Sequence, residues 1–209
     1  MTQTTTPAHS RTGTRTDRPA GSGPELRIAL IVGSVRSPRI ADPLLTWLTA
    51  ELEPLGWLRL DVIDLAGVDL PEADLAPGGT GSPISGRLAA ADAFVVLTPE
   101  YNHSFPSALK NAIDWHHVEW ARKPVALIGY GAGSGGIRAV EHLRTVFCEV
   151  RATTVREAVH LVAPWQRLGA DGVFTADDGA TDALAATMTE LRWWASTLRA
   201  GRESDPVPA

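Results

Sequence analysis

The chain has 209 residues, of which 44% are hydrophobic and 21% charged, a composition typical of a globular protein with one sizeable core. Its net charge of −5 argues against a general nucleic-acid binder, which would have a basic surface. The single cysteine, Cys148, excludes a disulfide within the chain and a thiolate-rich metal cluster. Because no apolar run approaches the ~18–20 residues of a membrane span and no signal-peptide core is visible, we expect no membrane association and a cytoplasmic location.

The two ends of the chain differ in composition from the rest. Residues 1–24 are almost all Thr, Ser, Gly, Pro, Ala and Arg. Because such a segment has little to bury, we expect a disordered N-terminal tail. The remainder is predicted to be one domain over residues 25–201, followed by a flexible C-terminus over residues 202–209.

Strand and helix patterns alternate along this domain. Residues 26–33 are a nearly continuous apolar run that ends in glycine, typical of a strand buried on both faces. Ser37-Pro38 follows, with an N-cap residue and a proline suited to a first helical turn, and apolar residues then recur at helical spacing as far as Leu52. Further strands are expected over residues 58–65, 93–98, 124–129 and within 153–162, a long loop over 66–83, and helices over 84–91, from 106, over 137–147 and over 184–198.

Five strands that alternate with helices predict an α/β fold, a doubly wound five-stranded parallel sheet in a three-layer α/β/α arrangement. In such sheets, ligands bind beyond the carboxyl ends of the strands. The loops at residues 33–39, 98–105 and 129–136 are therefore the candidate site.

The first of these loops, Gly33-Ser-Val-Arg-Ser-Pro-Arg39, has the features of an anion site. Free backbone N–H groups and the helix dipole favour a phosphate at a helix N-terminus. Ser34 can donate a hydroxyl hydrogen bond, and Arg36 and Arg39 can add charge-assisted ones. The loop lacks both the Gly-Lys-Ser/Thr ending of a Walker loop and the G-x-G-x-x-G dinucleotide pattern. We therefore predict a monophosphate site; the alternative is a helix cap with two solvated arginines.

The second loop, Thr98-Pro-Glu-Tyr-Asn-His-Ser-Phe-Pro106, places polar and aromatic residues directly after a strand. Tyr101 can stack on a planar ligand, and Asn102 and backbone N–H groups can hydrogen-bond to the edge of its ring. An ordinary Asn-containing turn is the alternative.

The third loop, Gly129-Tyr-Gly-Ala-Gly-Ser-Gly-Gly136, has five glycines in eight residues, and glycine allows close approach of the backbone to a ligand. It also comes close to the G-x-S-x-G nucleophile elbow, so a serine hydrolase that uses Ser134 is one alternative. The two later candidate histidines, His142 on a helix and His160 at a strand end, do not follow an acidic residue on a late loop. The hydrolase interpretation is therefore weaker.

Three further expectations concern residues outside these loops. His116-His117 does not predict a metal site, because adjacent residues on a helix point apart. Cys148 is expected to be buried on an apolar helix face. Trp115 and Trp120 are expected at a dimer contact.

Together the three loops resemble the NADPH-dependent FMN reductases of the flavodoxin-like superfamily, which include quinone, azo-dye and chromate reductases. The resemblance covers about residues 26–165. The segments that carry it are Gly33-Ser-x-Arg-x-x-Arg39, Pro99-Glu-Tyr-Asn102, Lys110-Asn-Ala-Ile-Asp-Trp115, Gly131 and Ser134-Gly-Gly-x-Arg-Ala139.

The resemblance implies a flavodoxin-like fold, non-covalent FMN and a homodimer or homotetramer with flavin at the subunit interface. It places the phosphate at the first loop, the ribityl chain and isoalloxazine at the second, and the pyrimidine edge of the ring at the third. The residues that it assigns to FMN are Ser34, Arg36, Arg39, Ile40, Pro99, Glu100, Tyr101, Asn102, Gly131 and Ser134.

The implied reaction is ping-pong hydride transfer from NADPH (or NADH) to flavin N5, and on to a quinone, azo, flavin or metal-oxyanion acceptor. Because the cofactor carries this chemistry, no side chain is predicted to be catalytic and none to bind a metal. A flavodoxin-type electron carrier without NADPH turnover is an alternative from another class. The length of the chain and the segment from Lys110 to Trp115 favour the reductase.

Overall fold

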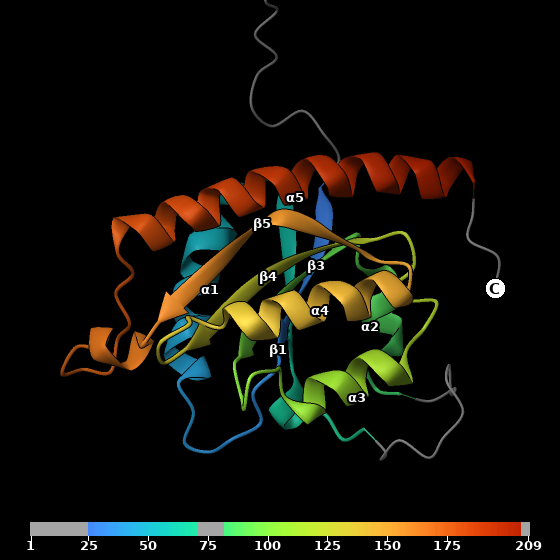
Figure 1. The fold of residues 1–209 in the computed structure, drawn as a ribbon. Helices are drawn as coiled ribbons and strands as arrows, with labels where there is room; N and C mark the ends of the chain where they lie inside the picture. The colour runs from blue at the N-terminus through green and yellow to red at the C-terminus, as the bar shows by residue number, and fades with distance from the viewer. Residues whose placement is uncertain (1–24, 71–81, 206–209) are drawn as a thin grey trace, which may run out of the picture.

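The fold is described from a computed structural model, which describes residues 25–70 and 82–205. The predicted disordered tail over residues 1–24 therefore lies outside the described residues. Five parallel strands form one sheet in the order β2-β1-β3-β4-β5 (Figure 1). The strands are β1 (Leu26–Val32), β2 (Leu58–Asp64), β3 (Ala93–Pro99), β4 (Pro124–Gly131) and β5 (Thr153–Val162). The predicted doubly wound parallel sheet is confirmed.

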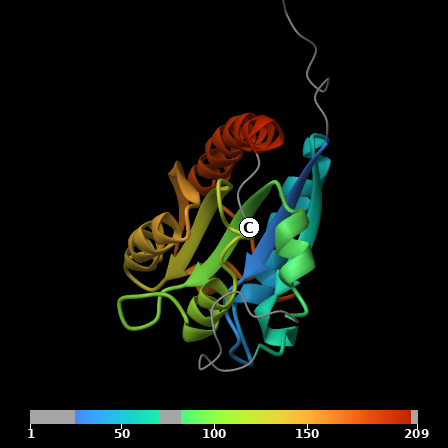
Figure 2. The same cartoon turned by 90° about the vertical axis from the view of Figure 1, so that its right-hand side faces the viewer.

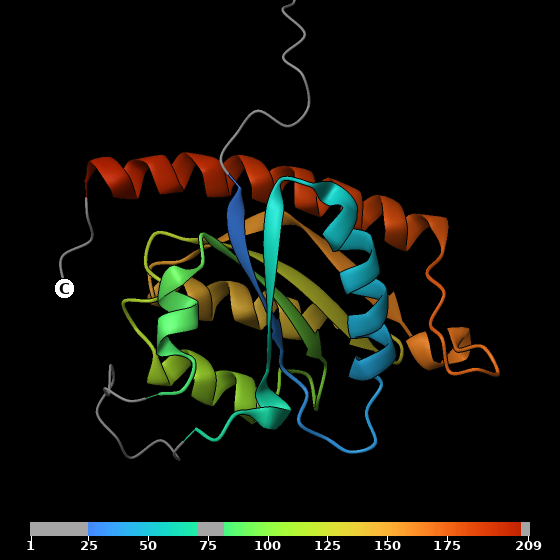
Figure 3. The same cartoon turned by 180° about the vertical axis from the view of Figure 1, so that it is seen from behind.

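Helices cover both faces of this sheet, as the view in Figure 2 and the view from behind in Figure 3 show. The helices α1 and α5 pack on one face, and α2, α3 and α4 pack on the other. No helix in the part of the chain that the structure describes is long and apolar enough to cross a membrane. The α-helices are α1 (Ala41–Leu52), α2 (Ser85–Ala90), α3 (Ser107–Trp115), α4 (Ile137–Glu149) and α5 (Asp178–Ser204). Three short 3-10 helices are η1 (Glu53–Leu55), η2 (Leu65–Gly67) and η3 (Pro164–Arg167).

Strand alternation divides the core between the two faces. On β1, Ile28 and Leu30 pack toward α1 and α5, whereas Ala29 and Ile31 pack toward the other three helices. Because both faces are covered, β1, β3 and β4 are almost entirely buried, which is why their sequences are apolar runs rather than alternating patterns.

Two helix boundaries differ from the predicted ones. The first helix begins at Ala41, with Ile40 at the N-cap position, and not at Ser37-Pro38. The last helix continues to Ser204, so the predicted domain end at residue 201 is too early, and Arg202 contacts Asp92 at 3.5 Å. Residues 206–209 lie outside the described residues.

The predicted surroundings of three side chains are also wrong. Trp115 and Trp120 are buried within the chain, and the Trp120 ring lies 4.6 Å from Phe94 and 5.5 Å from Phe147, centroid to centroid. They are core residues and cannot form the expected dimer contact. Cys148 is exposed, because the residue after the buried Phe147 is turned by about 100° around the helix, onto its solvent side.

Candidate functional site

A cleft of about 350 Å³ lies at the carboxyl ends of β1, β3 and β4. This is the position at which open parallel sheets bind ligands. It contains eight of the ten residues assigned to the cofactor from the sequence; Asn102 and Ser134 do not line it. The lining residues are Ser34, Arg36, Pro38, Arg39, Ile40, Pro99, Glu100, Tyr101, Tyr130, Gly131, Ala132 and Trp165.

Three side chains meet where the first two loops come together. Ser34 is buried, and its Oγ lies 3.1 Å from the hydroxyl of Tyr101. The guanidinium of Arg36 lies over the Tyr101 ring, 3.7 Å from its centroid. Among the described residues, Arg36 has no carboxylate partner. Its positive charge is therefore available to a negatively charged ligand in the cleft.

Arg39, by contrast, is held by other parts of the protein. Its guanidinium forms a bidentate ion pair with Asp64 at the end of β2, and it also donates to Asp42 at 2.8 Å and to the carbonyl oxygen of Ser34 at 2.6 Å. The hydrogen bonds between Arg39 and Asp64 raise the pKa of the arginine and lower that of the aspartate. Every nitrogen of the guanidinium thus has a partner, and Arg39 fixes the shape of the loop after β1.

A tight turn presents Tyr101 to the cleft. Two backbone hydrogen bonds of 2.8 and 3.0 Å join Tyr101 and Ser104, and the two residues between them, Asn102 and His103, have φ values of 48° and 73°. Asparagine tolerates this left-handed region better than most residues. Asn102 therefore serves the turn, and the structure does not bring it to the cleft.

The glycines of the third loop allow close packing between β4 and α4. A Cβ on Gly136 would lie 2.4 Å from the backbone nitrogen of Tyr130, and the φ of Gly136 is 86°. A Cβ on Gly131, which lines the cleft, would lie 3.3 Å from the Gly136 nitrogen. The glycine-rich sequence is thus required first by the fold at this junction, and it also leaves exposed backbone at the cleft.

The carboxylate of Glu100 joins the second and third loops. Its side chain is 8% exposed; it accepts hydrogen bonds from Ser134 Oγ at 2.7 Å and from Arg138 at 2.8 Å (Nη1) and 3.1 Å (backbone N–H). Burial alone would raise the pKa of Glu100, but these hydrogen bonds outweigh it and lower the pKa. Because the Ser134 hydroxyl binds this carboxylate and the His142 ring binds Ser104 instead, the geometry does not support a serine hydrolase.

Two aromatic residues of the cleft were not predicted as site residues. Tyr130 is buried, and its hydroxyl has no hydrogen-bond partner among the described residues; burial raises its pKa. Trp165 is 46% exposed and follows β5 on η3. The rule that ligands bind at carboxyl strand ends points to both: Trp165 follows β5, and Tyr130 lies in the predicted third loop, at what the structure shows to be the end of β4.

The likeness of the chain to known proteins agrees with this geometry. The chain is 33% identical over 189 residues to an NADPH:quinone oxidoreductase of Arabidopsis thaliana, covering 84% of this chain and 94% of the relative. It is 31% identical over 162 residues to a 2-hydroxy-1,4-benzoquinone reductase of a Burkholderia species, covering 73% and 87%.

Solved structures show the same fold. The flavoenzyme FerB of Paracoccus denitrificans, an NAD(P)H:(acceptor) oxidoreductase, superposes with a TM-score of 0.65 at 26% identity, over 81% of this chain and 97% of FerB. The family model described as NADPH-dependent FMN reductase matches residues 26–166, which include all three loops of the cleft. The chain belongs to the NADPH-dependent FMN reductase family.

Proposed function

We propose that the cleft at the carboxyl ends of β1, β3 and β4 holds FMN, and that the chain passes reducing equivalents from NAD(P)H to a quinone. FMN is the cofactor of this family of oxidoreductases and NAD(P)H is the electron donor. The observation that carries the assignment to this cleft concerns Arg36. It lies in the first loop, between β1 and α1, and has no carboxylate partner among the described residues.

The residues present fit this cofactor. The cleft volume of about 350 Å³ lies in the range of ~300–1,000 Å³ typical of small-molecule sites. Arg36 supplies a cation for the phosphate, Tyr101 and Trp165 supply aromatic surface for a flat ring, and Gly131 allows the backbone to come close. The buried Tyr130 hydroxyl lies beside the same cleft and has no hydrogen-bond partner within residues 25–70 and 82–205.

When bound, FMN accepts a hydride from NAD(P)H and returns the electrons to an acceptor. The protein contributes binding and orientation. Arg36 and the Ser34 hydroxyl are placed to neutralise and hydrogen-bond a phosphate. Backbone N–H groups of the second and third loops can stabilise negative charge on the ring edge. Glu100 is occupied by Ser134 and Arg138, so its negative charge is balanced within the protein.

A quinone is the acceptor class that the relatives favour. Both relatives described above, the Arabidopsis and the Burkholderia enzymes, are named for quinone reduction. Trp165, half-exposed at the mouth of the cleft, offers the flat apolar surface on which a planar quinone stacks. Azo compounds, free flavin and metal oxyanions are the other acceptor classes of this proposal, and they are to be compared with a quinone as substrates.

The test is turnover by the purified, FMN-loaded protein with 1,4-benzoquinone, measured as the loss of NADPH and NADH absorbance. We expect continuous oxidation of NAD(P)H that stops when the flavin is stripped from the protein and resumes when FMN is returned. Protein that takes up no FMN would overturn the assignment of the cleft. Protein that binds FMN but turns over no NAD(P)H would instead favour the flavodoxin-type electron carrier.

We also propose that the protein is a homodimer or homotetramer whose contact covers the cleft. Exposed apolar side chains lie in the segments that form the cleft or adjoin it: Val35, Val162 and Trp165 are 46%, 55% and 46% exposed, and burial of such surface drives association. Light scattering of the FMN-loaded protein gives its mass, and Val162→Glu should shift it toward the monomer. A wild-type monomer would refute this arrangement. The cytoplasmic location stays a prediction.

A further inference from the structure

A second groove lies at the amino ends of β1 and β2, at the opposite end of the strands from the cofactor cleft. It has a volume of about 410 Å³ and runs between the starts of these strands and α2. Ala29, Gly86 and Ala90 give it an uncharged floor of small side chains and backbone, and Arg27 and Arg59 line it. We call this feature the arginine groove.

Arg27 and Arg59 are direct neighbours across two strands. They are paired in the register of β1 and β2, and both are exposed. Parallel strands lie about 4.8 Å apart, and like charges at paired positions destabilise a sheet. The fold alone therefore gives no reason for two arginines at this position.

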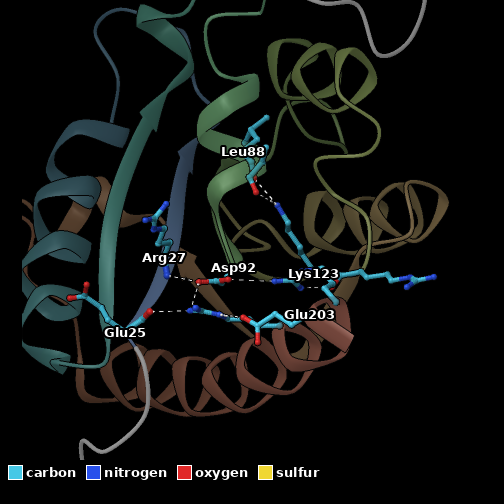
Figure 4. A network of polar contacts seen from close by, with 10 residues as sticks. Glu25, Arg27, Leu88, Asp92, Lys123 and Glu203 are labelled. Carbon is cyan, nitrogen blue, oxygen red and sulfur yellow. Dashed lines mark hydrogen bonds and ion pairs between the residues drawn. The ribbon is translucent and has the colours of Figure 1, made fainter. Parts of the chain in front are cut away.

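Neither guanidinium has a carboxylate partner among the described residues. Arg27 contacts Asp92 through its backbone alone: its N–H donates to the Asp92 carboxylate at 2.9 Å, and its carbonyl accepts from the Asp92 N–H at 2.7 Å. Figure 4 shows the Arg27 side chain extending away from that carboxylate. The side chain of Arg59 makes no hydrogen bond or ion pair within residues 25–70 and 82–205, although its backbone is part of the sheet. The two side chains thus resemble Arg36 in the cofactor cleft, whose charge is also not neutralised by a carboxylate.

Of the carboxylates that the structure describes, those near the groove are paired with arginines or lie outside the groove. Asp61 is held by Arg87, whose Nε donates to it at 3.0 Å. Asp92 accepts from two arginines of α5, at 3.3 and 3.5 Å, and Glu203 pairs with one of them at 3.0 Å. Glu25 is exposed and lines the adjoining hollow, not the groove. The positive charge of the arginine pair is therefore not cancelled within the groove.

Lys123 removes a further obstacle to an anion. The carbonyl groups at the end of α2 would repel negative charge, but Lys123 Nζ donates to the carbonyls of Leu88 and Ala89 at 2.8 Å each (Figure 4). The adjoining hollow, of about 480 Å³, shares Arg27 and Arg59 with the groove. An anion at the arginine pair thus has room on both sides.

We propose that the arginine groove binds a phosphate-bearing small molecule, with Arg27 and Arg59 on the phosphate oxygens. Guanidinium groups bind phosphate through paired N–H donors, and two of them side by side offer donors and positive charge to both phosphates of a diphosphate. The volume of the groove leaves space for a larger group beside the phosphates, resting on the uncharged floor. The site lies at the amino ends of the strands and is separate from the cofactor cleft at their carboxyl ends.

The proposal is tested by calorimetric titration of FMN-loaded protein with inorganic pyrophosphate and, in a second series, with ADP. Loading with FMN occupies the other candidate phosphate site. We expect binding that weakens as salt is added, and that falls tenfold or more in the double variant Arg27→Gln/Arg59→Gln. Tighter binding of ADP than of pyrophosphate would identify the source as a nucleotide, and equal binding would identify the phosphates alone.

The matched control is Arg151→Gln/Arg156→Gln, which removes the same charge from exposed positions outside the groove. It should bind pyrophosphate as the wild type does. The groove variant should keep the wild-type flavin spectrum. Its melting temperature should not fall, because the substitution removes a like-charge pair. The proposal is overturned if wild-type protein binds neither probe, if the groove variant binds as the wild type does, or if the control loses as much affinity.

Discussion

Arg36 and Arg39 lie three residues apart on the loop after β1, yet their guanidinium groups have different surroundings. Arg36 stacks on Tyr101 in the cleft, whereas Arg39, whose side chain is 11% exposed, is bound to Asp64 and to the Ser34 carbonyl. From sequence alone both residues have the same chemistry. The difference is the contact between Arg39 and Asp64 on β2, 25 residues along the chain. It makes Arg39 the residue that holds the loop and leaves Arg36 to bind a ligand.

Their alanine variants should therefore differ. Arg36→Ala should weaken FMN binding tenfold or more with no change in the melting temperature of the apoprotein, because it removes one charge-assisted contact. Arg39→Ala should also lower the free energy of unfolding, by about 2 kcal/mol, because Asp64 loses its partner. Flavin fluorescence titration and urea unfolding measure the two quantities. Equal effects of both variants on stability would contradict the separation.

At the scale of elements, Gly136 is the glycine with the least space at the junction of β4 and α4. Gly136→Ala should cost more than about 3 kcal/mol of stability, because the new Cβ would lie 2.4 Å from the Tyr130 nitrogen and the left-handed backbone adds its own strain. Gly133→Ala is the matched control, because a Cβ there meets nothing within 4 Å. It should change stability by less than about 0.5 kcal/mol. Urea unfolding of the two apoproteins distinguishes them; a tolerated Gly136→Ala would show that the loop can rearrange.

The elements themselves could largely be predicted from the sequence. All five strands and the five main helices lie where apolar runs and helical spacing place them, because both signals are local. The start of α1 could not be predicted, since Arg39 holds the preceding loop through a distant strand. The burial of Trp120 likewise depends on Phe94 and Phe147. The cleft was located by the rule of carboxyl strand ends. Tyr130 lay in the third predicted loop but was not assigned to the cofactor, because its burial at the end of β4 is set by packing that the sequence does not show.

For the whole molecule, the two lysines give a test of pH dependence. Lys123 is buried, and burial lowers its pKa to about 8, below the ~10.4 of an unfolded chain. Between these values the unfolded state holds a proton that the folded state has lost, so this residue makes stability rise with pH. Measured against Lys123→Met, the free energy of unfolding of the wild type should rise by up to about 3 kcal/mol between pH 8 and pH 10.5.

The comparison with Lys110→Met controls for the loss of a lysine as such. Lys110 is the only other lysine in the sequence, and it is exposed on α3 beside Asp114. The difference between wild type and Lys110→Met should stay nearly constant over the same pH range. Chemical unfolding at several pH values measures both series. A constant difference for Lys123→Met as well would refute the lowered pKa.

The end of α5 has a consequence for the order in which the chain can fold during synthesis. Arg199 donates to the carbonyl of Glu25, across 174 residues, and Arg202 reaches Asp92 ahead of β3. At ~5–20 residues per second, β1 leaves the ribosome roughly 10–35 s before these partners are made. This strand, which lies between β2 and β3 in the sheet, therefore stays incompletely covered until the last turns of the chain are made. A nascent chain stalled at residue 198 should remain open to protease.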